Sequence, residues 1–140
     1  MTNSLTYADS TWLIEWLIVF TGGFAPNELA KRIKDAAPSL IIAASCGVEG
    51  MTKTIPYMPL VDEAITLSGV DVKTVVMFQR QQAKATLKQG RDIDWHEFVK
   101  GAKDTKPVPV KSTDPLYILY TSGTTGLPKV TLQWNEMIVL

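Results

Sequence analysis

Near residue 120 the sequence reads Leu116-Tyr117-Ile118-Leu119-Tyr120-Thr121-Ser122-Gly123-Thr124-Thr125-Gly126-Leu127-Pro128-Lys129. The first five of these residues follow Asp114-Pro115 and form an apolar, aromatic run bounded by turn residues. Such a run predicts a buried strand over 116–120. The next nine residues contain four hydroxyls, two glycines and one lysine, which is the composition of a loop. Because Pro128 disfavours a helix that begins at the last glycine, we expect this loop to join two strands.

The composition of this loop suits a phosphate group. Gly123 and Gly126 can adopt backbone angles closed to other residues, so successive N–H groups can point into one concavity that binds an anion. Lys129 adds a mobile positive charge. The hydroxyls that add neutral donors belong to Thr121, Ser122, Thr124 and Thr125. The loop differs from the Walker pattern, whose Lys-Ser/Thr pair directly follows the last glycine. The simpler interpretation is an ordinary surface turn, in which Thr, Ser and Gly are common.

The complete string from Tyr120 to Lys129 resembles the signature loop of the adenylate-forming (AMP-binding) enzymes. This family includes acyl-CoA synthetases, firefly luciferases and peptide-synthetase adenylation domains. The resemblance implies that the loop holds the β- and γ-phosphates of ATP while a carboxylate attacks the α-phosphate. Further segments are similar to short-chain acyl-CoA synthetases, and the similarity is closer to propionyl-CoA than to acetyl-CoA synthetases. These segments are Gly22–Ile33, Ala44–Glu49, Gly90–Trp95 and Asp114–Tyr120.

The resemblance also implies ATP, Mg²⁺ and coenzyme A as substrates or cofactors, and a short-chain carboxylate as the acyl donor. Coenzyme A would be bound partly by a Gly-Gly turn, which Gly22 and Gly23 match, and partly by arginines of a later segment. Lys53 stands in that segment and offers a phosphate one charge without the two-pronged geometry of arginine. The sequence gives no set of metal ligands and no residue that acts on the substrate itself.

Both ends of the chain depart from the family pattern. Residues 1–21 and 133–140 are divergent, and residues 22–132 form a partial AMP-dependent synthetase/ligase domain. We expect a truncated central piece of the large N-terminal domain, inactive alone, because the parts that bind adenine and the acyl group and the C-terminal lid lie downstream. Two alternatives stay open. One is a non-catalytic fragment that binds nucleotide or pyrophosphate, and the other is a structural or interaction remnant without a ligand.

The overall composition is that of an ordinary globular domain. The 140 residues are 46% hydrophobic and 20% charged, with 14 basic and 14 acidic side chains. This balance does not indicate nucleic acid or an anionic membrane as a partner. The longest apolar run, Trp12–Phe20, contains Glu15 and is shorter than the roughly 20 residues that span a bilayer. We expect this run to be buried in a core, and to promote self-association if it is exposed. No targeting segment is seen, so we expect the cytoplasm or the mitochondrial matrix.

Helices and strands alternate along the chain. Helical spacing of apolar residues predicts helices over 27–37, 60–67 and 94–100, the last capped by Asp94 with Glu97 in a capping box. Apolar runs predict strands over 40–44, 74–78 and 116–120, with another beginning at 130, and the first is expected to be buried on both faces. Residues 45–59 and 79–91 are expected to be connections. The alternation predicts an α/β fold, with a partial parallel-sheet layer and flanking helices.

Three other candidate sites have simpler explanations. His96, the only histidine, is close in sequence to Asp92, Asp94 and Glu97, but solvated helix polarity explains these charges better than a metal cluster does. Cys46 is the only cysteine, and its position after an apolar run indicates packing rather than a thiol–imidazole pair. Ser122 lacks the Gly-x-Ser-x-Gly pattern of a nucleophile elbow.

Overall fold

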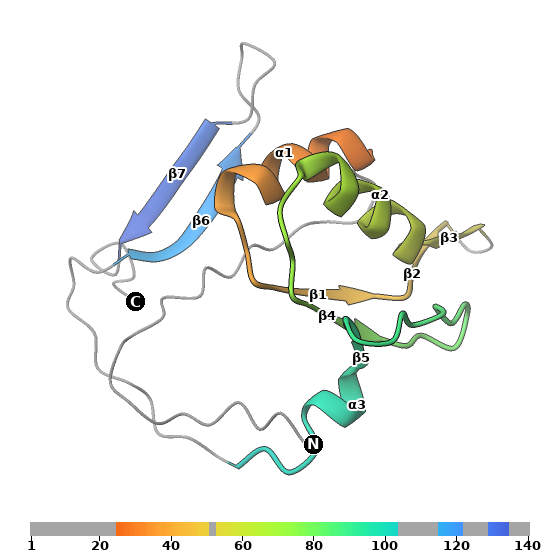
Figure 1. Ribbon diagram of the computed structural model, residues 1–140. Helices are drawn as coiled ribbons and strands as arrows, with labels where there is room; N and C mark the ends of the chain where they lie inside the picture. Colours follow the sequence, from red (N-terminus) through yellow and green to blue (C-terminus); the bar gives the residue numbers. More distant parts are fainter. Residues whose placement is uncertain (1–24, 51–52, 104–114, 122–128, 135–140) are drawn as a thin grey trace.

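A three-stranded parallel sheet is the centre of the fold in the computed structural model, which describes residues 25–50, 53–103, 115–121 and 129–134 (Figure 1). The described elements are α1 (Pro26–Ala36), β1 (Leu40–Ala44), β2 (Cys46–Glu49), β3 (Lys53–Pro56), α2 (Met58–Ser68), β4 (Thr74–Phe78), β5 (Asp92–Asp94), α3 (Trp95–Phe98), β6 (Pro115–Thr121) and β7 (Lys129–Trp134). The predicted α/β class is confirmed. The apolar run 12–20 lies outside the described residues.

The sheet has the strand order β1-β4-β5, and both of its pairings are parallel. Ile42 lies opposite Val76, and Val76 lies opposite Ile93. The predicted strands 40–44 and 74–78 are therefore confirmed at their predicted bounds. Strand β5 was not predicted, because three residues with two aspartates carry no apolar signal. Its pairing with β4 makes it a strand.

Helices α1 and α2 lie side by side and cover one face of this sheet (Figure 1). The fully buried Ile33 of α1 and Ala64 of α2 pack against Val75 and Met77 of β4 in one core cluster. Burying one such aliphatic side chain stabilises the fold by roughly 1.5–3 kcal/mol. Helix α1 begins at Pro26, one residue before the predicted start, and ends at Ala36, one residue before the predicted end, because Ala37 adopts a left-handed conformation (φ 44°) just before Pro38.

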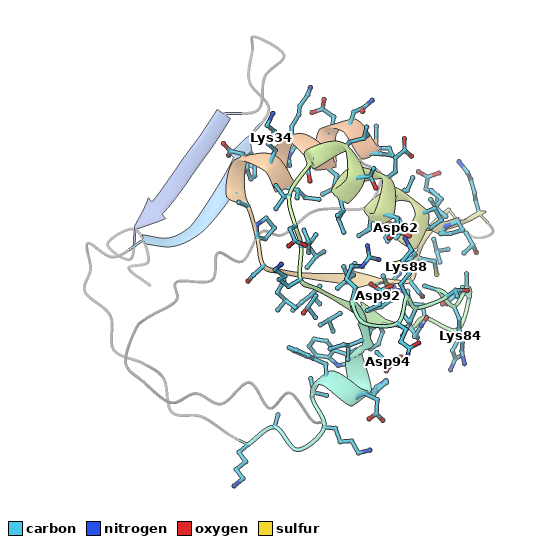
Figure 2. All side chains as sticks on the ribbon, viewed as in Figure 1. Lys34, Asp62, Lys84, Lys88, Asp92 and Asp94 are labelled. Atoms are coloured by element: carbon cyan, nitrogen blue, oxygen red, sulfur yellow. The ribbon has the colours of Figure 1, made fainter. Side chains whose placement is uncertain are left out.

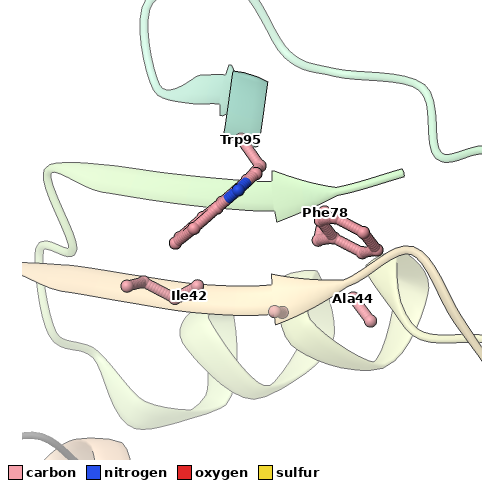
Figure 3. Close-up of a pocket in the computed structure, with 5 residues that line it drawn as sticks. Ile42, Ala44, Phe78 and Trp95 are labelled. Atoms are coloured by element: carbon pink, nitrogen blue, oxygen red, sulfur yellow. The ribbon is translucent and has the colours of Figure 1, made fainter. Parts of the chain in front are cut away.

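The second face of the sheet is only partly covered, and the prediction that β1 is buried on both faces is wrong. Ile42 is 48% exposed, and Phe78 and Ile93 on the neighbouring strands are 43% and 38% exposed. Figure 3 shows Trp95 of α3 leaning over this face toward Ile42. An open, mostly apolar hollow of about 370 Å³ lies there, and its walls are Ile42, Ala43, Ala44, Phe78 and Trp95. Among the described elements, α3 is too short to cover the whole face.

The predicted connection over 45–59 contains an antiparallel hairpin instead. Strands β2 and β3 pair with Cys46 opposite Pro56 and Glu49 opposite Lys53. Helix α2 then begins at Met58, two residues before the predicted start, because a proline is tolerated in the first helical turn. Asp62 therefore lies beyond the first turn of α2, where the helix dipole has little effect on a carboxylate. Residues 79–91 form no helix, and the connection predicted there is confirmed.

Helix α3 is capped as predicted. The Asp94 side chain accepts a hydrogen bond from the His96 backbone N–H at 2.9 Å. Glu97 pairs with Lys100 at 3.4 Å, and this ion pair takes the place of the second half of the expected capping box. The helix ends at Phe98, two residues short of the prediction. Within the described ranges, no helix combines the length and the apolar character needed to cross a membrane.

Asp62 connects α2 to the segment that leads into β5. Its carboxylate accepts a hydrogen bond from Arg91 at 2.6 Å. The same carboxylate pairs with Lys88 at 2.9 Å (Figure 2). Arg91 also donates to Asp92 at 2.6 Å. Burial alone would raise the pKa of Asp62, but the hydrogen bonds from Lys88 and Arg91 outweigh burial and leave this pKa below its usual value. The charged form of Asp62 is therefore favoured by folding.

This lowered pKa predicts how stability changes in acid. A carboxyl group whose pKa is lower in the folded than in the unfolded chain adds stability above its unfolded pKa of about 4, and that stability is lost as the pH falls further. We expect Asp62→Asn to unfold at lower urea concentration at pH 7 and to lose less additional stability than the native chain below about pH 4. Glu63→Gln, at a neighbouring exposed carboxylate, is the matched control. Equal acid sensitivity of Asp62→Asn and the native chain would contradict this account.

Candidate phosphate-binding hairpin

The two ends of the signature stretch pair as the antiparallel strands of a hairpin, β6 and β7. Strand β6 pairs with β7 so that Tyr120 lies opposite Val130 and Thr121 lies opposite Lys129. The predicted strand over 116–120 and the strand that begins near 130 are confirmed. Opposite residues in such a pair have Cα atoms about 4.5–5.5 Å apart, so the backbone holds the hydroxyl residue Thr121 and the cationic residue Lys129 at the same end of the hairpin. Residues 122–128 between them lie outside the described residues, and they include the candidates Ser122, Gly123, Thr124, Thr125 and Gly126.

Tyr120 joins this hairpin to helix α1. Its hydroxyl donates a hydrogen bond to Asp35 Oδ2 at 2.7 Å, and the guanidinium carbon of Arg32 lies 5.3 Å from the centre of its ring. That distance is within the range of a cation–π contact. Burial raises the pKa of Tyr120, and the hydrogen bond to Asp35 raises it further. Sequence reasoning missed this link because 85 positions separate the two partners and neither belongs to a recognisable motif.

The candidate coenzyme A residues can be placed only in part. Lys53 begins β3, and its Nζ lies 3.0 Å from Oε2 of Glu49, its cross-strand neighbour. Both side chains are exposed, so this ion pair contributes only about 0–1 kcal/mol and can be exchanged for another anion. Gly22 and Gly23 lie outside the described residues. The structure therefore places Lys53 on the β2–β3 hairpin without bringing it together with the other two candidates.

The sequence of the chain matches the family model of AMP-binding enzymes over residues 17–134. The chain belongs to the AMP-binding enzyme family. An uncharacterized protein of Pseudomonas aeruginosa is 54% identical over 118 residues, which are 84% of this chain and 18% of that protein. Mouse mitochondrial acyl-CoA synthetase short-chain family member 3 is 46% identical over 109 residues, which are 77% of this chain and 16% of the relative.

A third relative is the acetyl-coenzyme A synthetase of Chromobacterium violaceum, 40% identical over 114 residues, or 80% of this chain and 17% of the relative. These relatives confirm the predicted resemblance to adenylate-forming enzymes and to short-chain acyl-CoA synthetases. The chain spans less than a fifth of the length of each of these three proteins.

The polar residues near α3 contact other parts of the fold in this member of the AMP-binding enzyme family. The His96 ring packs against Phe78 with ring centres 6.0 Å apart, Asp94 caps the helix, and Glu97 pairs with Lys100. Over the described ranges, no three His, Cys, Asp or Glu side chains gather in a group suited to a metal ion. Cys46 is completely buried, and its burial fits a packing role. Ser122 lies outside the described residues.

The residue types of this hairpin suit an anion better than they suit a metal ion. Its closing pair supplies a lysine and a threonine, which are respectively a cation and a neutral donor. Two glycines in the intervening sequence allow backbone N–H groups to face an anion. These groups donate to negative charge and supply no carboxylate ligand. A Mg²⁺ ion at this site would therefore be coordinated by the phosphate oxygens and not by side chains of the hairpin.

Proposed function

We propose that residues 121–129 bind the β- and γ-phosphates of ATP in an ATP-dependent short-chain acyl-CoA synthetase. The observation that carries this proposal is the hairpin pair Thr121–Lys129, which closes the two ends of the signature loop. The binding residues are Thr121, Ser122, Gly123, Thr124, Thr125, Gly126 and Lys129. In the reaction, a carboxylate attacks the α-phosphate to form acyl-AMP, pyrophosphate leaves, and the thiol of coenzyme A then takes the acyl group.

The loop contributes by electrostatics. Negative charge accumulates on the leaving pyrophosphate, and donors already fixed around it stabilise that charge without reorganising. Lys129 supplies the full positive charge of the loop. The backbone N–H groups and the hydroxyls of the loop add partial positive charges. Mg²⁺, when bound with ATP, neutralises part of the phosphate charge. For coenzyme A, the proposed residues are Gly22, Gly23 and Lys53, with Lys53 exchanging Glu49 for a phosphate.

For the acyl group we propose propionate in preference to acetate, because several segments resemble propionyl-CoA synthetases more closely than acetyl-CoA synthetases. The proposed compartment is the cytoplasm or the mitochondrial matrix. A polypeptide of only these 140 residues is proposed to bind the phosphates without completing the reaction, because it covers under a fifth of its relatives. Formation of propionyl-CoA from propionate, ATP and coenzyme A by this polypeptide would contradict that part of the proposal.

Competition between ligands tests the phosphate assignment. We expect ATP with Mg²⁺ to bind the chain at one site in isothermal titration calorimetry. Pyrophosphate should displace it, and adenosine should not, because the loop contacts phosphates alone. Displacement by adenosine with no effect of pyrophosphate would show that the binding site lies elsewhere. Absence of any ATP binding would favour the remaining alternative, a structural remnant without a ligand.

The exposed apolar face supports a second proposal, that the chain self-associates. Ile42, Phe78 and Ile93 form this face on three adjacent strands, and exposed apolar patches of this kind mark interaction surfaces. We expect the native chain to sediment as a concentration-dependent oligomer and Ile42→Gln to sediment as a monomer. Leu67→Gln, at another exposed apolar residue on α2, is the control and should sediment as the native chain does. Identical sedimentation of Ile42→Gln and the native chain would contradict the proposal.

A further inference from the structure

The side chain of Tyr120 contacts a part of α1 that is held by hydrogen bonds and by burial in the core. The Arg32 guanidinium lies over the Tyr120 ring, and Arg32 as a whole residue is only 7% exposed. The Arg32 guanidinium donates to the backbone carbonyl of Glu28 at 2.6 Å and lies 3.4 Å from the Glu28 carboxylate. The next residue, Ile33, is 1% exposed and belongs to the core cluster. A group held by Arg32 and Asp35 is therefore held in place relative to the sheet.

Tyr120 also lies where the paired strands of the hairpin meet the loop. Thr121, the first residue of the loop, follows it directly in the chain. Across the hairpin, Tyr120 pairs with Val130, which follows Lys129 at the other end of the loop. One attached side chain thus fixes the position of both ends of the loop.

We propose that Tyr120 is a positioning residue, which fixes the paired strands β6 and β7 against α1, where the phosphate loop begins and ends, through its hydrogen bond to Asp35 and its ring contact with Arg32. Its effect on ATP rests on the proposed function, whereas the attachment itself does not. Without the attachment, the loop would keep its chemical groups and lose its orientation relative to the α/β core. The Tyr120 hydroxyl must be protonated to donate, so the attachment weakens once the pH rises far enough to ionise it.

Titration of the tyrosines tests the attachment without any ligand. In NMR spectra of the chain labelled with ¹³C-tyrosine, the resonance lost in Tyr120→Phe identifies this residue. We expect its pKa to lie above the ordinary value of about 10 and to fall in Asp35→Asn, because the negative charge that opposes ionisation is gone. Asp71→Asn, which removes the same charge from an exposed loop position, should leave the titration unchanged. An unchanged pKa in Asp35→Asn would overturn the proposal.

Affinity for ATP with Mg²⁺ tests the positioning role. We expect Tyr120→Phe and Asp35→Ala each to weaken binding about fivefold, the effect of losing one hydrogen bond, and the double variant to be no weaker than either. Asp35→Asn, which keeps an acceptor oxygen, should retain most of the affinity. Additive losses in the double variant would overturn the role. If the native chain binds no ATP, the proposed function fails, while the titration still decides the attachment.

Discussion

Lys129→Ala is expected to weaken the binding of ATP with Mg²⁺ by about ten- to a hundredfold. The variant removes a full positive charge from the residue that pairs with Thr121 across the hairpin. A hydrogen bond to a charged group contributes roughly 1.5–3 kcal/mol, and each 1.4 kcal/mol changes affinity about tenfold. Isothermal titration calorimetry measures the loss. The affinity for pyrophosphate should fall by a similar factor, because the lysine acts on the phosphates rather than on adenosine.

Two companion variants make this result specific. Lys84→Ala removes the same charge from an exposed position in the loop that follows β4 and should leave ATP affinity unchanged (Figure 2). Lys129→Arg keeps the charge and should retain a larger part of the affinity than Lys129→Ala does. Equal ATP affinity of Lys129→Ala and the native chain would show that Lys129 is not part of the binding site. Equal losses in Lys84→Ala and Lys129→Ala would show that net charge alone is responsible.

Gly47→Ala is expected to destabilise the fold by about 1–3 kcal/mol, the usual cost of overpacking. Gly47 is buried in β2, and a Cβ atom at this position would overlap the hydroxyl and ring of Tyr57 and lie 3.0 Å from its Cε1. The backbone of Tyr57 is fixed, because its N–H donates to the Ser45 carbonyl at 2.9 Å and its carbonyl accepts from Val61, so only rotation of the Tyr57 side chain could relieve the overlap. Urea unfolding of the variant and the native chain measures the cost.

A double variant tests whether the overlap with Tyr57 is the cause. In a Tyr57→Leu background the ring is absent, so Gly47→Ala should cost much less than it does in the native chain. Val48→Ala, at an exposed position of the same strand, is the control for a change in β2 and should have a small effect. An equal cost of Gly47→Ala in both backgrounds would assign the loss to the backbone of β2 rather than to the Tyr57 ring.

Local patterns in the sequence predicted the elements that carry strong signals of their own. Helix α1, strands β1 and β4, and the two strands of the signature hairpin all have the expected type. The elements that were missed depend on distant partners. β5 is a strand because it pairs with β4, and β2 and β3 are strands because they pair with each other.

The polar contacts that join distant segments gave no signal in the sequence. Ser45 is 1% exposed, and its hydroxyl donates to the Ala83 carbonyl at 2.6 Å while accepting from the Arg80 N–H at 2.8 Å. A serine after an apolar run looks like an ordinary turn residue until the fold brings residues 80–83 beside it. The same holds for the bond between Tyr120 and Asp35. In the candidate site, the loop chemistry was predictable from residue types, but its attachment to α1 was not.

The central claim is that the loop closed by Thr121 and Lys129 binds the phosphates of ATP. Amide hydrogen exchange over residues 115–134, with and without ATP and Mg²⁺, tests this claim most directly. The account predicts that β6 and β7 are protected in both samples, because their amides pair across the hairpin. It also predicts that the amides of residues 121–129 gain protection only when ATP and Mg²⁺ are present. Exchange in this loop that is the same with and without ATP would contradict the claim.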